Sequence, residues 1–194
     1  VLVQGHIKIH DPESGAVFVN KRNAIHYENM SIALAESVAN QGQGFISSMA
    51  FGNGGTSVDP TGIITYLTPN STGTNASLYN QTFTKIVDDR SVSNLDPQRN
   101  KIETRHVNGT NYTDVVVTCL LDYGEPNGQD ATDTASASDS LYVFDELGLV
   151  SYASSGTGKL LTHVIFHPVQ KSLNRLIQID YTVRVQSLTG FNEG

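Results

Sequence analysis

The sequence predicts a mainly β protein: an antiparallel β-sandwich with one short α-helix and an N-terminal β-hairpin. Three observations favour this fold class. Apolar and polar residues alternate over long stretches, most regularly in LIQIDYTVRV (176–185), and this is the period of a half-buried strand. Turn signals rich in glycine, proline and asparagine separate the stretches. Only the segment that follows Asn29 has the apolar spacing of a helix.

Residues 1–20 predict the hairpin, because two alternating segments flank the turn DPESG (11–15). Isolated two-stranded hairpins are marginal in water, so their apolar stripe must be covered. The hairpin precedes the helix, and we therefore expect residues 1–27 to be an assembly arm that a neighbouring subunit covers. Removing residues 1–20 should then leave a folded chain that no longer assembles. The stripe consists of Val3, Ile7, Ile9 and Val17.

The helix is expected to begin at Asn29 or Ser31, since either side chain can cap it, and to end at QGQG (41–44). Residues 28–194 are expected to form the sandwich domain. Asn108-Gly109 predicts a tight β-hairpin between two flanking strands.

Later elements follow from the same signals. GKLLTHVIFHPV (158–169) predicts a strand that Pro168 ends, and LIQIDYTVRV predicts its long partner. Two segments, residues 56–82 and 124–140, are rich in small polar residues and are expected to be long loops.

The glycine-rich segment FGNGGTSVDP (51–60) raises the question of a phosphate site. A Walker loop needs a lysine that is missing here, and a dinucleotide-binding loop must open a helix, whereas Pro60 leads into an irregular stretch. A nest of backbone N–H groups remains an alternative, since it can bind an anion. We expect instead a structural turn in which Gly52, Gly54 and Gly55 allow a tight corner with positive φ.

The histidines do not predict a metal site. His6/His10 and His163/His167 have the i, i+4 spacing that brings two imidazoles together on a helix, but all four lie in predicted strands. At roughly 3.3 Å per residue, such a pair is about 13 Å apart on a strand and cannot share one ion. We therefore expect no metal and no cofactor.

Paired carboxylates and the single cysteine complete the candidates for chemistry. Adjacent residues on a strand face opposite ways, so Asp88–Asp89 and Asp145–Glu146 are expected to be solvated pairs and not catalytic dyads. Cys119 lies in an apolar strand and is expected to be a small core residue. No G-x-S-x-G motif surrounds a serine, and we expect no enzymatic activity.

Composition argues against two kinds of partner. The net charge is −7, and the 12 basic residues are scattered singly, which argues against nucleic acid. No apolar run approaches the roughly 20 residues that span a bilayer, so no membrane is expected as a partner.

One ordered set of features resembles a family. A short helix leads to the glycine-rich segment, FDELGLVSYASSGTGKLL (144–161) follows, and a long alternating strand ends the set. This order is similar to that of small virion structural proteins of tailed bacteriophages, including the tail-collar and fibre-adaptor type. Gly52, Gly54 and Gly55 match the family's glycine-rich turn, and residues 146–149 match its ELGL-like element.

The resemblance covers residues 28–186. It implies a non-enzymatic, homo-oligomeric structural component of the tail, collar or baseplate, located in the virion and assembling with itself and with other virion proteins. A capsid decoration (cement) protein is an alternative of the same class. A carbohydrate- or receptor-binding β-sandwich is an alternative of another class, in which the stacking residues would be Tyr66, Tyr79, Tyr112 or Tyr152.

Overall fold

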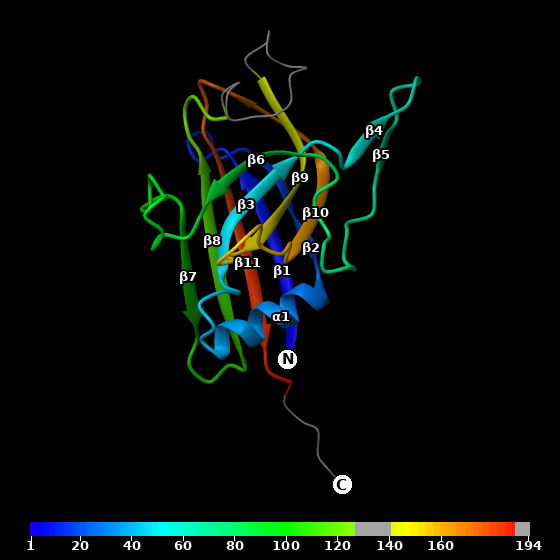
Figure 1. Cartoon of the computed structure of the whole chain (residues 1–194). Helices are drawn as coiled ribbons and strands as arrows, with labels where there is room; N and C mark the ends of the chain where they lie inside the picture. Colours follow the sequence, from blue (N-terminus) through cyan, green and yellow to red (C-terminus); the bar gives the residue numbers. More distant parts are fainter. Residues whose placement is uncertain (127–140, 189–194) are drawn as a thin grey trace.

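A computed structural model describes residues 1–126 and 141–188 of the chain. It confirms a mainly β fold with one helix and an N-terminal β-hairpin (Figure 1). The main sheet has nine strands, all antiparallel, in the order β6-β3-β9-β10-β2-β1-β11-β8-β7, and a separate two-stranded sheet pairs β4 with β5. The elements are β1 (Leu2–His10), β2 (Val17–Ile25), α1 (Tyr27–Val38), β3 (Ile46–Gly52), β4 (Thr56–Val58), β5 (Ile64–Tyr66), β6 (Gln81–Ile86), β7 (Lys101–His106), β8 (Tyr112–Leu121), β9 (Leu141–Ser151), β10 (Thr162–Ser172) and β11 (Ile177–Gln186).

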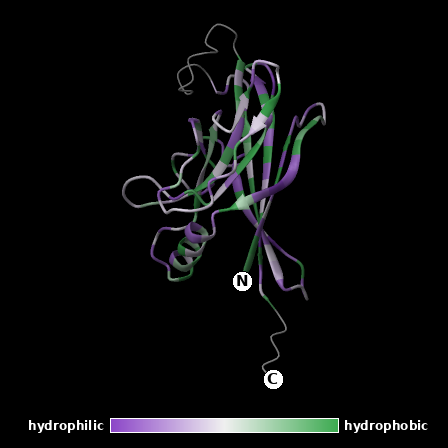
Figure 2. Cartoon of the chain, turned by 90° about the vertical axis from the view of Figure 1, so that its right-hand side faces the viewer, coloured by the Kyte–Doolittle hydropathy of each residue, from purple (hydrophilic) through white to green (hydrophobic). Residues whose placement is uncertain are grey.

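The main sheet curls, and its two halves share one core. The halves meet at β10 and β2, which pair only through Thr162↔Ile25 and His163↔Ala24. Apolar and polar residues interleave along the long strands (Figure 2), and their inward side chains join a single hydrophobic cluster. The largest fully buried apolar or aromatic members of the cluster are Ile7, Ile9, Met49, Phe51, Leu121, Phe144, Leu147, Leu149, Leu161, Ile177 and Tyr181.

The N-terminal hairpin lies inside this sheet and is not an added arm. β1 pairs with β2 on one side and with β11 on the other, from Leu2↔Gln186 to His10↔Gln178. Val3, Ile7 and Ile9 are buried in the core of this chain, whereas Val17 is half exposed. The expectation of an arm that a neighbour covers was therefore wrong. Removing residues 1–20 would take β1 and the first part of β2 from the sheet and expose the core.

The helix α1 lies across one end of the curled sheet (Figure 1). Its N-cap is His26, whose Nδ1 accepts a hydrogen bond from Asn29 N at 3.1 Å, so the cap precedes the expected Asn29 or Ser31. Asn29, Met30 and Ala33 form the buried face of the helix. No helix among the described residues is long and apolar enough to cross a membrane.

Two predicted boundaries need correction. β10 runs through Pro168 because its register with β9 shifts between Ile165 and Val169, and proline is tolerated at such irregularities. The expected loop 56–82 contains the β4–β5 hairpin, while most of the expected loop 124–140 falls outside the described residues. The Asn108-Gly109 hairpin is confirmed, since β7 and β8 pair on either side of it.

Candidate functional site

The connection from β3 to β6, residues 53–80, is hereafter the 53–80 excursion. It leaves the sheet at Gly52, carries the β4–β5 hairpin and returns at Gln81. Gly52 pairs with Glu146 of β9, and this is the last pair between β3 and β9. Beyond this point the strand β9 has no β3 neighbour, and the excursion takes the place of that neighbour.

Asp145 of β9 receives the first contacts from the excursion. Its Oδ1 accepts a hydrogen bond from Gly55 N at 2.9 Å. Its Oδ2 accepts from Thr56 N at 2.9 Å and from Thr56 Oγ1 at 2.6 Å. Asp145 is buried, so these donors replace the water that the carboxylate loses on folding. The root of the β4–β5 hairpin is thereby fixed to β9.

Glu146 is fully buried and holds both ends of the excursion. Its Oε1 accepts from Gly54 N at 3.2 Å and from Asn80 N at 2.8 Å. Its Oε2 accepts from Tyr79 N at 3.0 Å and from His163 Nε2 at 2.8 Å. Burial raises the pKa of Glu146, but the hydrogen bonds from His163, Asn80 and Tyr79 outweigh burial, and its pKa lies below the ordinary value. Glu146 is therefore a buried anion.

His163 of β10 completes this cluster and is also fully buried. Its Nδ1 accepts from Asn70 N at 2.8 Å, which leaves the ring proton on Nε2, where it is donated to Glu146. The Tyr79 ring packs against the imidazole, with 5.5 Å between ring centroids. We call Asp145, Glu146 and His163 the buried acid cluster. It binds the excursion near its start, middle and end.

A second buried histidine supports the same excursion. His26 Nε2 lies 2.8 Å from Gly73 O, while its Nδ1 accepts the helix-capping bond from Asn29 N. The ring proton of His26 is placed as in His163, since one ring nitrogen accepts from a backbone N–H group and the other donates. The middle of the excursion is thus tied to the start of α1.

The glycine-rich segment therefore binds anions, but the anions are the chain's own side chains. The positive φ expected at the corner is absent, because Gly52, Gly54 and Gly55 are not among the described glycines with positive φ. Close approach explains them instead: a Cβ on Gly52 would lie 2.4 Å from Asn80 O and 2.5 Å from Glu146 Oε1. The expectation that Asp145 and Glu146 are solvated was also wrong.

The arrangement is suited to holding backbone and not to presenting a reactive group. Each carboxylate oxygen of Asp145 and Glu146 already accepts at least one hydrogen bond. A general base needs a lone pair that can reach a substrate proton. The buried acid cluster is best described as a structural clamp.

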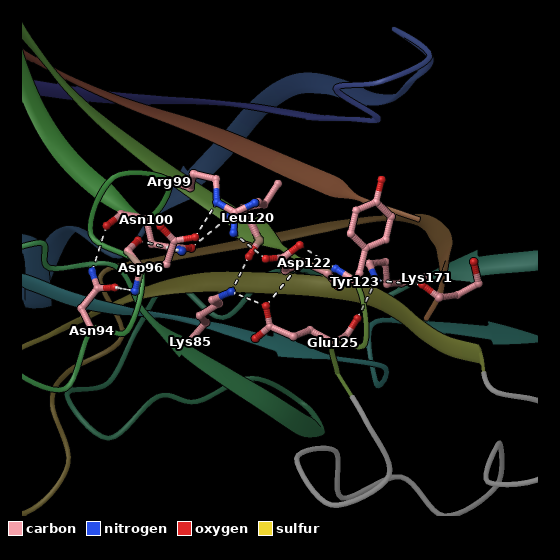
Figure 3. Close-up of polar contacts among 11 residues, drawn as sticks. Lys85, Asn94, Asp96, Arg99, Asn100, Leu120, Asp122, Tyr123, Glu125 and Lys171 are labelled. Carbon is pink, nitrogen blue, oxygen red and sulfur yellow. Dashed lines mark hydrogen bonds and ion pairs between the residues drawn. The ribbon is translucent and has the colours of Figure 1, made fainter. Parts of the chain in front are cut away.

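A lysine cluster forms the other dense polar region (Figure 3). Lys171 of β10 is fully buried, and its ammonium donates to three backbone oxygens: Asp122 O at 2.9 Å, Glu125 O at 2.7 Å and Ser172 O at 2.8 Å. Burial lowers the pKa of Lys171 to about 8, although Glu125 and Asp122 oppose the shift. All three ammonium donors are in use, so this lysine fixes the segment that follows β8.

The same cluster connects β6, at one edge of the curled sheet, with β8, the strand next to the other edge. Lys85 of β6 donates to Leu120 O of β8 at 2.5 Å and to Glu125 Oε1 at 2.6 Å. Arg99 donates to Asp122 Oδ2 at 2.6 Å from the β6–β7 connection. The contact between Lys85 and Leu120 bridges two strands that lie far apart in the sheet order.

The remaining candidates from the sequence belong to neither cluster. His10 Nε2 lies 2.8 Å from Asp180 Oδ2, while His6 and His167 are exposed. Cys119 is buried, and burial raises the pKa of its thiol to about 12. No group of three or more His, Cys, Asp or Glu side chains that could hold a metal ion occurs in the described part of the chain.

The four tyrosines weighed as stacking residues differ in their surroundings. The Tyr152 ring stacks on Phe45 with centroids 4.9 Å apart, and the Arg184 guanidinium lies 3.9 Å from the Tyr112 ring centroid. Tyr79 donates its hydroxyl to the excursion itself. Tyr66 is half exposed on β5.

The β4–β5 hairpin projects from the body of the protein (Figure 1). Its register pairs Val58 with Ile64 and Thr56 with Tyr66, so these residues share one face and Ser57 and Thr65 the other. The exposed apolar side chains on and beside the hairpin are Val58, Ile63, Tyr66 and Leu67, of which Val58 and Ile63 are both 63% exposed.

Comparison with known proteins identifies no family. No family model matches the chain, and searches of curated proteins and of solved structures find no similar protein. The fold and the two polar clusters therefore define a mainly β protein with a clamped, projecting hairpin.

Proposed function

We propose that this chain is a non-enzymatic assembly protein that contacts a neighbouring subunit through its β4–β5 hairpin. The observation that carries the proposal is an apolar hairpin face held away from the core on a fixed root. A two-stranded hairpin is marginal by itself, and on this face Val58 is 63% and Tyr66 is 49% exposed, while Ile64 is partly buried. Exposed apolar patches of this kind mark protein interfaces.

The setting that we propose is a tailed-phage particle, at the tail, collar or baseplate, with a capsid decoration protein as the alternative. This setting rests on the resemblance of Gly52–Gly55 and of residues 146–149 to the phage family. These two motifs, far apart in the sequence, contact one another through Gly52↔Glu146 and Gly54 N–H···Oε1 of Glu146. Such pairing gives a reason for both motifs to occur in one chain.

The test compares two surface substitutions of equal exposure. Ile63 lies in the turn of the β4–β5 hairpin and is 63% exposed, while Val107 lies in the β7–β8 turn and is 62% exposed. Sedimentation of the unaltered chain over a concentration series should show oligomers. Ile63→Asp should shift the protein to monomer, and Val107→Asp should not. A chain that stays monomeric throughout, or two variants that behave alike, would contradict the proposal.

The phage setting needs its own experiment. Cross-linking of assembled particles followed by mass spectrometry should place the hairpin against a second copy or another virion protein. If the protein is absent from such particles, the phage setting is rejected. The assembly role is tested separately by sedimentation.

A recess beside Tyr152 favours glycan binding as a second candidate function. The recess has a volume of about 690 Å³, and its lining includes Tyr152, Asn75, Gln81, Ser48 and Thr84. One aromatic ring with nearby amides and hydroxyls is a common arrangement for a sugar. A glycan array with the unaltered chain, Tyr152→Ala and the control Tyr66→Ala tests it. Binding that only Tyr152→Ala abolishes would favour this function.

A further inference from the structure

A cavity of about 380 Å³ lies between α1 and the curled sheet. Its wall is largely apolar and comes from elements on both sides of the curl. The helix contributes Met30, Ala33 and Leu34, β8 contributes Val115, and β11 contributes Val183 and Val185. The volume lies in the range of small-molecule sites, which are concave and mostly apolar with a few placed polar groups.

An apolar cavity of this size has an energetic consequence. Leu34, Val115 and Val185 in its wall are only partly buried, so part of the apolar wall faces solvent. An apolar molecule of suitable size would remove this surface from water, which is favourable. The chamber therefore favours an apolar ligand body.

The mouth of the chamber selects the charge of the ligand. Asp88, Asp89 and Arg90 line it, and a second recess of about 570 Å³ shares Ser37, Phe45, Asp88 and Arg90 with it and adds Glu36. Among the described residues that line either recess, the ionisable side chains are three carboxylates and one guanidinium, which sum to a formal charge of −2.

The one cation at this mouth already has partners. Arg90 Nε lies 3.4 Å from Asp88 Oδ1, and its guanidinium carbon lies 5.5 Å from the centroid of the Phe45 ring. Asp89 is exposed, and its Oδ1 accepts from Ile102 N at 3.1 Å. A carboxylate accepts more hydrogen bonds than this one, so Asp89 can also accept from a ligand.

We propose that this cavity is a binding site for a small amphipathic cation, with the apolar body in the chamber and an ammonium group at Asp89. A fatty acid would bring a negative charge close to the three carboxylates, which would repel it. A neutral molecule would fill the chamber and leave the carboxylates unused. None of the described residues that line the cavity belongs to the β4–β5 hairpin.

Two probes of equal length and opposite charge test the proposal: octylammonium and octanoate. Calorimetry should detect octylammonium binding to the full chain and octanoate binding at least ten-fold weaker. Methyl NMR locates the probe, because the signals of Met30, Leu34 and Val183 should shift while those of Val58 and Leu67 on the hairpin should not. Equal binding of the two probes, or shifts away from the chamber, would overturn the proposal.

Two substitutions in the chamber, one substitution at Asp89 and one control separate the chamber from its mouth. Ala33→Leu adds volume to the wall and should abolish binding while preserving the circular dichroism spectrum; Val185→Phe, at the half-buried rim, tests the same point if Ala33→Leu fails to fold. Asp89→Asn should lower the affinity for octylammonium about five-fold and should not lower the affinity for octanoate. Glu28→Gln, on the exposed side of α1, is the matched control and should change neither probe. Unchanged octylammonium affinity in the filled chamber would overturn the site.

Discussion

Replacing Glu146 by glutamine tests whether the buried acid cluster holds the 53–80 excursion. The change keeps the size and shape of the side chain and removes its charge. The carboxylate accepts from four donors: the backbone N–H groups of Gly54, Tyr79 and Asn80 and the ring N–H of His163. A carboxamide can serve two of them with its oxygen, and its NH₂ group then faces the other two.

In either orientation of the glutamine side chain, its NH₂ group faces two hydrogen-bond donors. If NH₂ faces Gly54 and Asn80, two backbone donors lose their acceptor. If it faces His163, the ring must move its proton to Nδ1, where Asn70 N already donates. A buried donor left without a partner costs about 1–3 kcal/mol, so two of them cost about 2–6 kcal/mol. Domains are stable by about 5–15 kcal/mol, and the loss is therefore large.

Urea unfolding followed by circular dichroism measures this loss. Glu146→Gln should lower the unfolding midpoint strongly, and limited proteolysis should show earlier cleavage within residues 53–80. Glu103→Gln is the matched control, since Glu103 is a partly exposed residue of β7 paired with Lys101 and Arg105, and its midpoint should stay unchanged. A Glu146→Gln loss below about 1 kcal/mol would refute the clamp.

The same variant gives a pH dependence of known sign. The pKa of Glu146 in the fold lies below its ordinary value of 4.5. A depressed carboxylate pKa contributes stability at pH values above the ordinary value, and this contribution is lost as the pH falls through the lower value in the fold. The stability difference between the unaltered chain and Glu146→Gln should therefore narrow below pH 4.5. A difference that stays constant to lower pH would assign the effect to packing.

Two further substitutions test the glycine approach and the buried lysine. Gly52→Ala should destabilise the chain by about 1–3 kcal/mol, because the new Cβ would lie 2.4 Å from Asn80 O, whereas Ser57→Ala on the polar face of the hairpin should be neutral in the same urea assay. Lys171→Met should change the pH profile of stability, because the pKa of Lys171 is about 8 in the fold against 10.5 ordinarily. As the pH rises from about 8 to 10.5, the unaltered chain should gain stability relative to the variant. Parallel pH profiles of the two proteins would contradict this expectation.

The long strands could be predicted from the sequence, but their order could not. Alternation in residues 1–10 identifies a strand, and the turn at 11–15 identifies its partner β2. The second partner of β1 is β11, and the pair Leu2↔Gln186 joins opposite ends of the chain. A stripe as narrow as Val3, Ile7 and Ile9 fits an arm as well as a central strand, because local pattern carries no information about such distant pairing.

The sequence contains a signal of the buried acid cluster, and the signal appears only when the acids and the glycine-rich segment are considered together. Asp145 and Glu146 lie within an apolar strand, between Phe144 and Leu147, and burial of acids there requires donors. The glycine-rich segment offers backbone N–H groups with little side-chain bulk. The buried acids need hydrogen-bond donors, and the glycine-rich segment needs acceptors. The two segments pair with one another although about 90 residues of sequence separate them.

The two properties of the 53–80 excursion belong together physically. Its root is rigid, because buried charged acceptors bind its backbone at Gly54–Thr56 and Tyr79–Asn80. Its tip is apolar and exposed at Val58 and Ile63. Ordering a loop on binding costs conformational entropy, and a hairpin already fixed in place avoids most of that cost. A buried, hydrogen-bonded charge adds little net stability over an apolar side chain of similar size, because its loss of water offsets its hydrogen bonds. The clamp is therefore better explained by this preorganisation than by stabilisation of the sheet. A loosely held hairpin with the same apolar face would bind a neighbour more weakly, even though it would bury the same side chains.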